Sequence, residues 1–169
     1  YVSILSTCMK KAKNAFHQIV KAVIHCHSRK VFHNDIKPYN IMYHEITGHI
    51  KLIDFSYGDM LQEEFYTQAP EPFTVWTLGI TLFEMICGRM PFKNKMEIVE
   101  GKFSVTSDIS QGEQQFSEKL FKCRNFIERC LCSHPSDRIT VEGILKHPWL
   151  CRGSNKVSDK EQHYFHPLK

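Results

Sequence analysis

The chain has 169 residues and 42% of them are hydrophobic, which is enough for one domain with a buried core. Its formal net charge is +4, and its Lys and Arg residues are scattered instead of grouped with aromatic side chains, so we expect no nucleic-acid binding. No apolar run is long enough to cross a membrane, and the first residues lack the pattern of a secretory signal. We therefore expect no membrane contact and an intracellular location, in the cytoplasm or the nucleus.

The cysteines indicate a reducing compartment. There are seven, an odd number, and they show no CxxC spacing, so we expect reduced and mostly buried thiols. The run His25-Cys26-His27 contains residue types that bind metals, but neighbouring residues on a helix point in different directions around its axis. We therefore expect no zinc site there.

The first predicted element is a helix over residues 10–27. Its apolar residues recur at helical spacing on one face: Ala12, Phe16, Ile19, Val20, Val23 and Ile24. A β-hairpin is predicted next, with strands over residues 41–45 and 49–53 that alternate in character around the turn dipeptide Thr47-Gly48. The pattern therefore predicts an amphipathic helix packed on a core, followed by a hairpin.

The second half of the chain is predicted to be helical. Residues 73–87 are apolar almost all round, which is typical of a helix buried on every side, so this helix is expected to be the hub of the domain. The elements that follow are a short helix over 96–100, a polar loop over 101–115, an amphipathic helix over 116–131 and a short helix over about 140–146. Residues 151–169 are expected to form a loose, polar tail.

Two short motifs flank the predicted hairpin. The run His33-Asn34-Asp35-Ile36-Lys37-Pro38-Tyr39-Asn40 precedes it, and Leu52-Ile53-Asp54-Phe55-Ser56 ends it. Because a hairpin folds back on itself, Asn40 and Asp54 are expected to lie close together. The alternative interpretation is that Asp35 and Asp54 are solvated carboxylates, since Asp and Asn are ordinary loop residues. The ordered set, in this strand context, favours a functional site.

These motifs resemble the catalytic loop and the metal-binding segment of protein kinases. Further runs resemble the same family: Gly48–Phe55, Val75–Ile80, Cys87–Phe92, Pro135–Arg138 and His147–Trp149. The chain is therefore identified as similar to the C-terminal lobe of a serine/threonine protein kinase of the Pim type, over about residues 10–150. The resemblance implies a mainly α fold with a small β-hairpin beside the catalytic loop, in a lobe that spans residues 1–150.

The resemblance also implies a reaction, the transfer of the γ-phosphate of ATP to serine or threonine of a protein, with ATP and Mg²⁺ as cofactors. It implies catalytic roles for Asp35, which orients the substrate hydroxyl and accepts its proton, and for Lys37, which lies over the transferred phosphate. Lys37, Asn40 and Asp54 are the implied cofactor-binding residues, with Asn40 and Asp54 as magnesium ligands. His33 and Phe55 are expected to be packing residues beneath the site.

Larger departures from the family concern missing segments. The Gly-rich phosphate loop and the strand Lys have no counterpart upstream of residue 10, and the first residue is not Met, so we expect a fragment or a truncated form. The activation segment is expected to be shortened, because only three residues separate Ala69-Pro70-Glu71 from Val75. For Arg138 two alternatives are open, an ion pair with Glu71 or a place on the surface.

Smaller departures concern single residues. Asn34 stands where the family usually has Arg, so control by a phosphate on the activation segment is not expected. Ser56 stands where Gly usually follows Asp54-Phe55, which leaves the orientation of Asp54 open. Pro38 and Tyr39 replace acidic residues of the Pim type, so a preference for basic substrates is not expected either.

Three functional interpretations remain. The first is a protein serine/threonine kinase of which this chain is only a part, so that the chain alone is expected to be inactive. The second is a pseudokinase-like binding or scaffold module that docks on a true kinase through surfaces near Met96 and Phe121. The third is a truncated product with marginal stability. The expected partner is accordingly a protein substrate or a partner kinase, and the pattern predicts no oligomeric state.

Overall fold

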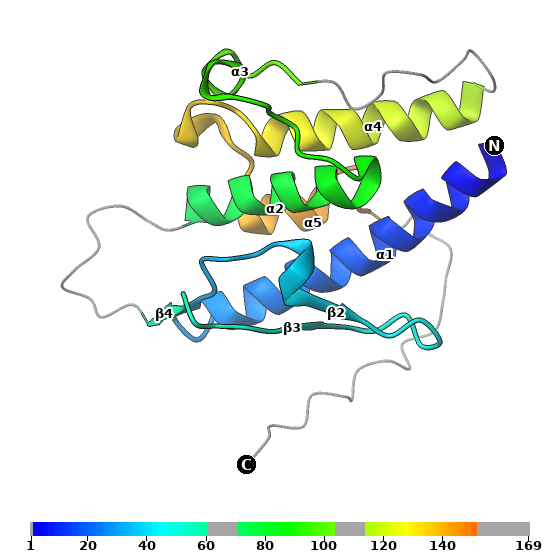
Figure 1. Cartoon of the computed structure of the whole chain (residues 1–169). Coiled ribbons are helices and arrows are strands. Elements are labelled where there is room, and N and C mark those ends of the chain that lie inside the picture. The colour runs from blue at the N-terminus through cyan, green and yellow to red at the C-terminus, as the bar shows by residue number, and fades with distance from the viewer. Residues whose placement is uncertain (1, 61–70, 104–113, 152–169) are drawn as a thin grey trace.

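The computed structural model describes residues 2–60, 71–103 and 114–151 and, within these ranges, the side chains of residues 9–58, 71–103 and 118–151 (Figure 1). Its elements in chain order are α1 (Val2–His27), β1 (Val31–Phe32), the 3₁₀ turn η1 (Pro38–Asn40), β2 (Ile41–Tyr43), β3 (Ile50–Leu52), β4 (Asp59–Met60), α2 (Glu71–Cys87), α3 (Lys95–Glu100), α4 (Gln114–Cys130), the 3₁₀ turn η2 (Pro135–Asp137) and α5 (Val141–Lys146). The expected mainly helical fold is confirmed. Its strands form two antiparallel pairs, β1 with β4 and β2 with β3.

The boundaries differ from prediction mainly at the first helix and in the hairpin. Helix α1 begins at Val2 instead of residue 10, because no Gly or Pro interrupts the intervening residues. The hairpin strands are three residues long instead of five, since residues 44–49 are used for the turn. The expected polar loop over 101–115 falls largely outside the described residues.

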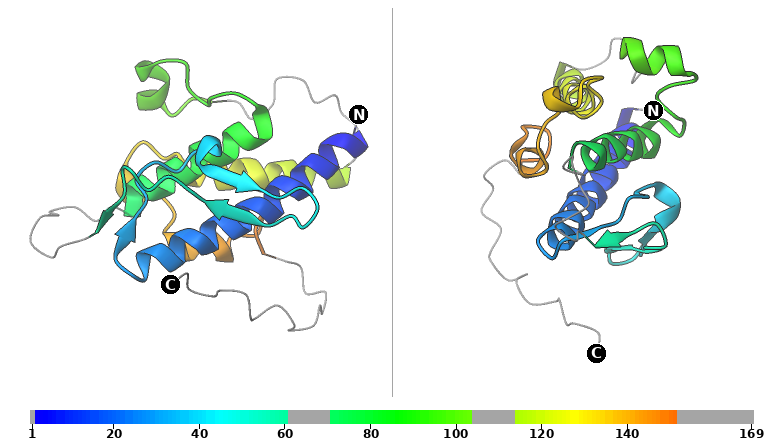
Figure 2. Two further views of the ribbon diagram at one scale, coloured as in Figure 1. Left: turned by 60° about the horizontal axis from the view of Figure 1, so that its bottom comes forward. Right: turned by 90° about the vertical axis from the view of Figure 1, so that its left-hand side faces the viewer.

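Helix α2 lies between α4 and α1 (Figure 1), and the β2–β3 hairpin lies against α1 on the side away from α4 and α5 (Figure 2). The fully buried side chains of the core include Phe16, Ile19, Val20, Val23, Val75, Leu78, Leu82, Phe83, Phe126, Ile127, Ile144 and Leu150. The prediction that the second helix is buried on every side is wrong. Its residue Phe73 is exposed and Trp76 is half-buried, because the neighbouring helices cover only part of its circumference.

One side chain of α1 holds the hairpin in place. The amide of Gln18 donates to the carbonyl oxygen of Gly48 at 2.8 Å and accepts from the backbone N–H of Ile50 at 3.3 Å. Gly48 has a φ of +69°, a left-handed conformation that favours glycine in the predicted turn. The hairpin is therefore fixed to the helix at its far end, and its open end carries the two motifs.

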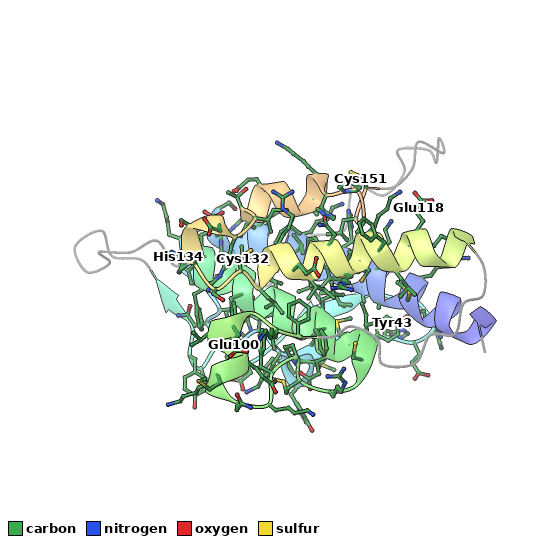
Figure 3. The ribbon with its side chains drawn as sticks, turned by 90° about the horizontal axis from the view of Figure 1, so that it is seen from above. Tyr43, Glu100, Glu118, Cys132, His134 and Cys151 are labelled. Carbon is green, nitrogen blue, oxygen red and sulfur yellow. The ribbon has the colours of Figure 1, made fainter. Side chains whose placement is uncertain are left out.

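Two further expectations from the sequence concern membrane-spanning helices and the state of the cysteines. Across residues 2–60, 71–103 and 114–151, no helix combines the length and the apolar character needed to cross a bilayer. The six cysteines whose side chains are described are free thiols, but only Cys123 and Cys130 are fully buried. Burial raises the pKa of Cys123 to about 12, so this thiol is protonated and unreactive at neutral pH. Cys151, by contrast, is exposed beyond α5 (Figure 3).

Candidate functional site

The first motif, called here the 33–40 loop, connects β1 to β2 and is anchored on α2. Ile36 is buried in the core, and its carbonyl oxygen accepts a hydrogen bond from the hydroxyl of Thr81 at 3.0 Å. Asn34 has a φ of +58°, a left-handed conformation that Asn tolerates better than most residues. The loop thus turns sharply on an interior anchor, with Lys37 exposed and Asn34 and Asp35 half-buried.

Asp35, Lys37 and Asn40 form one polar cluster. The ammonium of Lys37 lies 2.7 Å from Oδ2 of Asp35, and the amide Nδ2 of Asn40 donates to the same oxygen at 2.9 Å. These contacts, that of Lys37 first, lower the pKa of Asp35. The same pair raises the pKa of Lys37, to which the charge of Asp54 also contributes. Both groups are therefore charged at neutral pH.

Two hydrogen bonds from the side-chain nitrogen of Asn40 set the orientation of its amide group. Nδ2 donates to both the backbone oxygen and the carboxylate of Asp35, each at 2.9 Å, and Asn40 is buried. Within the described residues, Oδ1 of Asn40 accepts no hydrogen bond. The side chain is thus fixed with its amide oxygen free to act as a ligand.

Asp54 is brought to this cluster by the hairpin. The backbone N–H of Ile53 donates to the carbonyl oxygen of Asn40 at 2.9 Å, so the residue after Ile53 lies beside the cluster. Asp54 is exposed and has a φ of +62°. Hydrogen bonds from the hydroxyl and then the backbone N–H of Ser56 lower its pKa, and the charge of Lys37 acts in the same direction. The expected proximity of Asn40 and Asp54 is therefore seen.

His33 connects the two motifs. Its Nε2 lies 2.9 Å from the carbonyl oxygen of Ile53, and its Nδ1 lies 3.3 Å from the backbone N of Asp35. Its ring packs on that of Phe55, with 4.4 Å between the ring centroids. A neutral imidazole protonated on Nε2 satisfies both polar contacts. His33 is buried, as expected of a packing residue, but it also forms hydrogen bonds that position Asp35 and Asp54 relative to each other.

Met42 and Ile53 form an apolar surface on the outer face of the hairpin. Met42 pairs with Lys51, and Ile41 pairs with Leu52, and successive pairs point to opposite faces. Ile41 and Leu52 pack against the core, so Met42 and Ile53 face away from it, and they are 58% and 36% exposed. Ile53 belongs to the second motif, but no role was expected of either residue from the sequence. The alternation within the strands is the signal that could have found them.

The donor set can be tested against magnesium. Mg²⁺ prefers oxygen ligands and is usually held by one or two carboxylates together with substrate phosphates. Asn40 and Asp54 supply an amide oxygen and a carboxylate, which fits that pattern. Among the described residues, no three His, Cys, Asp or Glu side chains are grouped closely enough to hold a metal by themselves. A cation at this site would therefore need oxygens from another molecule, such as a nucleotide.

Arg138 neither forms an ion pair with Glu71 nor lies fully exposed on the surface, so both expected alternatives are wrong. Glu71 accepts a hydrogen bond from the backbone N–H of Val141 at 2.9 Å, and no salt bridge in the described part of the chain joins it to Arg138. Arg138 donates to the carbonyl oxygen of Pro72 at 2.9 Å and lies over the ring of Trp76. Both residues thus fasten the start of α2 to the segment before α5. The predicted shortening of the activation segment concerns residues 61–70, which lie outside the described residues.

Comparisons with known proteins identify the family of the chain. A family model for the protein kinase domain matches residues 3–68 and 60–150. Serine/threonine-protein kinase pim-2 of Danio rerio is 36% identical over 89% of this chain and 51% of that protein. SNF-related serine/threonine-protein kinase of Rattus norvegicus is 32% identical over 82% of this chain and 21% of that protein.

A third relative, sperm motility kinase 2A of Mus musculus, is 30% identical over 88% of this chain and 32% of that protein. The chain therefore spans about half the length of the pim-2 relative and less of the other two. The family match covers nearly all described elements, including both motifs of the site. On this match, the chain belongs to the protein kinase family.

Proposed function

We propose that this chain is the part of a serine/threonine protein kinase that carries the transfer chemistry, directing the γ-phosphate of Mg-ATP to a Ser or Thr hydroxyl of a protein. One observation carries the proposal. The charged pair Asp35–Lys37, the fixed amide of Asn40 and the carboxylate of Asp54 lie together at the open end of the hairpin. The two relatives named as serine/threonine-protein kinases support the choice of hydroxyl substrate.

Each of the four side chains has a chemical task in this proposal. Asp35 is ionised, so it can accept a hydrogen bond from the substrate hydroxyl and take up its proton. Lys37 is protonated and exposed, so it can contact a phosphate oxygen while it remains near Asp35. Asn40 and Asp54 would hold magnesium, which when bound neutralises charge on the phosphates. The protein contributes mainly positioned charge, as phosphoryl transfer requires.

The outer face of the hairpin supports nucleotide as the ligand. A nucleoside base is planar and largely apolar on its faces, and Met42 and Ile53 expose apolar surface next to the two proposed magnesium ligands. Pockets for cofactors typically combine such a surface with a few placed polar groups. The described residues supply only one side of such a pocket, so we expect affinity in the millimolar range for this chain.

Backbone amide NMR tests the location and the metal dependence of nucleotide binding. Mg-ATP should shift the amide signals of residues 34–58, and ATP with EDTA should shift them much less. The variant Asp54→Asn should lose the metal-dependent shifts, and it suits the test because Asn tolerates the left-handed backbone at this position. Asp137→Asn, in η2, is the matched control. Equal shifts with and without Mg²⁺, or none at millimolar ATP, would refute the proposal.

Transfer of the phosphate is measured separately. The chain is incubated with γ-labelled Mg-ATP and peptides that contain Ser, Thr or Tyr, and the labelled residue is identified. Label on Ser or Thr that is absent with Asp35→Asn shows that the chain itself catalyses transfer. Metal-dependent binding at residues 34–58 without label is the outcome expected if the chain carries only part of the catalytic machinery.

The second candidate is a binding or scaffold module with a protein partner. The observation that favours it is a set of apolar side chains on exposed positions, with Met96 and Val99 of α3 and Phe121 of α4 each more than two-thirds exposed. Contiguous exposed apolar surface is typical of interaction sites. The NMR experiment separates the candidates, because a scaffold requires no metal-dependent shifts at residues 34–58.

A further inference from the structure

Ser56 engages only one oxygen of Asp54. Its hydroxyl donates to Oδ1 of Asp54 at 2.5 Å, and its backbone N–H donates to the same oxygen at 3.2 Å. No hydrogen bond from the described residues reaches Oδ2. A carboxylate that accepts the N–H two residues later forms an Asx turn, which fixes its rotation. Asp54 therefore has one oxygen held by the protein and one left open.

The segment that carries Ser56 is itself held on several sides. Phe55 packs on the ring of His33, and the side chain of Asn34 donates to the carbonyl oxygen of Tyr57 at 3.2 Å. The backbone N–H of Gly58 closes a turn onto the carbonyl oxygen of Phe55 at 2.8 Å. The hydroxyl of Ser56 thus has a defined position before any ligand arrives, which is what a supporting group for a site requires.

We propose that Ser56 is a positioning residue of the metal site, holding Oδ1 of Asp54 so that Oδ2 alone is presented to the magnesium of Mg-ATP. This proposal rests on the proposed function. It gives a role to the residue that stands where the family usually has Gly, since glycine has no side chain with which to make the second hydrogen bond. Outer-shell partners of this kind orient metal ligands, and their loss typically weakens metal binding by about 10-fold to 100-fold.

If the hydroxyl of Ser56 blocked an oxygen that the cation needs, its removal would tighten metal binding. The two effects have opposite signs, so a metal affinity measured on matched variants separates them.

Binding of Mn²⁺ to the whole chain, in the presence of a non-hydrolysable ATP analogue, is measured from the electron paramagnetic resonance signal of the free ion. Ser56→Ala keeps the backbone N–H contact and removes the hydroxyl, so we expect Mn²⁺ affinity to fall about 10-fold. Ser56→Thr keeps the hydroxyl and should bind Mn²⁺ nearly as well as the unaltered chain. Affinity for the analogue in EDTA should not change in either variant, whereas a general loss of structure would lower it.

Ser136→Ala is the matched control, because Ser136 is also an exposed serine whose hydroxyl donates to a neighbouring aspartate, Asp137. It should leave Mn²⁺ affinity unchanged. Unchanged or tighter Mn²⁺ binding by Ser56→Ala, or a loss in Ser56→Thr equal to that in Ser56→Ala, would overturn the role of Ser56 while leaving the site intact. No Mn²⁺ binding by the unaltered chain would instead overturn the proposed function and the role of Ser56 with it.

Discussion

The helical core and the region of residues 33–58 are held together by different forces. In the core, Phe126 is fully buried and packs on the rings of Phe16, His147 and Trp149. The region of residues 33–58 contributes Ile36 to this core, but its polar side is tied by hydrogen bonds and one ion pair, and three of its residues, Asn34, Gly48 and Asp54, have left-handed backbone conformations. Burial of apolar surface is worth far more than exposed ion pairs.

The comparison indicates that stability and chemistry are separable in this chain. Substitutions in the core should unfold the domain, and substitutions of the exposed polar cluster should change ligand binding with little change in stability.

Phe126→Ala should destabilise the chain by about 3–5 kcal/mol, because it removes a fully buried ring and leaves a cavity among aromatic neighbours. The free energy of unfolding is measured by urea denaturation. Phe121→Ala is the matched control on the same helix, since Phe121 is 69% exposed, and it should change the free energy by less than about 0.5 kcal/mol. Equal effects of the two variants would contradict the description of the core.

Gly79→Ala should destabilise the chain by about 1–3 kcal/mol through overpacking. A Cβ at this position of α2 would lie 2.7 Å from Cβ of Cys130 and 2.9 Å from Cδ2 of Leu131, which are closer than real contacts allow. The urea midpoint measures the effect. A variant as stable as the unaltered chain would show that α2 and α4 are not packed this closely.

Acidification below pH 6.5 should destabilise the core through His147. Burial lowers its pKa, so the folded chain favours the neutral ring, and this contribution is present above 6.5 and is lost as the pH falls below that value. The neutral ring fits its contacts, because Nδ1 accepts from the backbone N–H of Trp149 and Nε2 lies 3.1 Å from Oδ1 of Asn125. His27, whose pKa is also lowered by burial, acts in the same direction.

The measurement is the free energy of unfolding at pH 7.5 and at pH 5.5. His147→Gln, which cannot take up a proton, should show a smaller difference between the two. A difference as large as that of the unaltered chain would assign the pH dependence to other groups.

Lys37→Met should raise the pKa of Asp35 with almost no effect on stability. The lowered pKa of Asp35 means that its contribution is present above about 3.8 and is lost as the pH falls further, and the contact with Lys37 is its largest cause. The carboxyl titration of Asp35 is followed by NMR. Lys122→Met, which breaks an exposed ion pair on α4, should leave the pKa of Asp35 unchanged.

Several parts of this fold and site follow from local patterns in the sequence. The apolar spacing of α1 and α4 and the ordered motifs around Asp35 and Asp54 are visible within short windows, so their elements and proximity were predictable. The pairing of β1 with β4 was not predictable, because a strand of two residues is too short to show an alternating pattern. Gly48, which accepts from Gln18, and Pro72, which accepts from Arg138, lie 30 or more residues away from these side chains, and no local pattern encodes such contacts.

The contact between Ser56 and Asp54 was only partly predictable from the sequence. An Asp followed two residues later by Ser is a frequent turn pattern, so a contact between them could have been expected from the sequence. That both hydrogen bonds go to the same carboxylate oxygen of Asp54 is visible only in the structure.

The most direct test of the separation between core and site is thermal unfolding of the chain and of Asp54→Asn, each with and without Mg-ATP. Without nucleotide, the two midpoints should agree within about 2 °C, because Asp54 is exposed and outside the core. Mg-ATP should raise the midpoint of the unaltered chain only, since a ligand that binds the folded state stabilises it. Equal shifts in both proteins, or no shift in either at millimolar nucleotide, would contradict a magnesium-nucleotide site at Asn40 and Asp54.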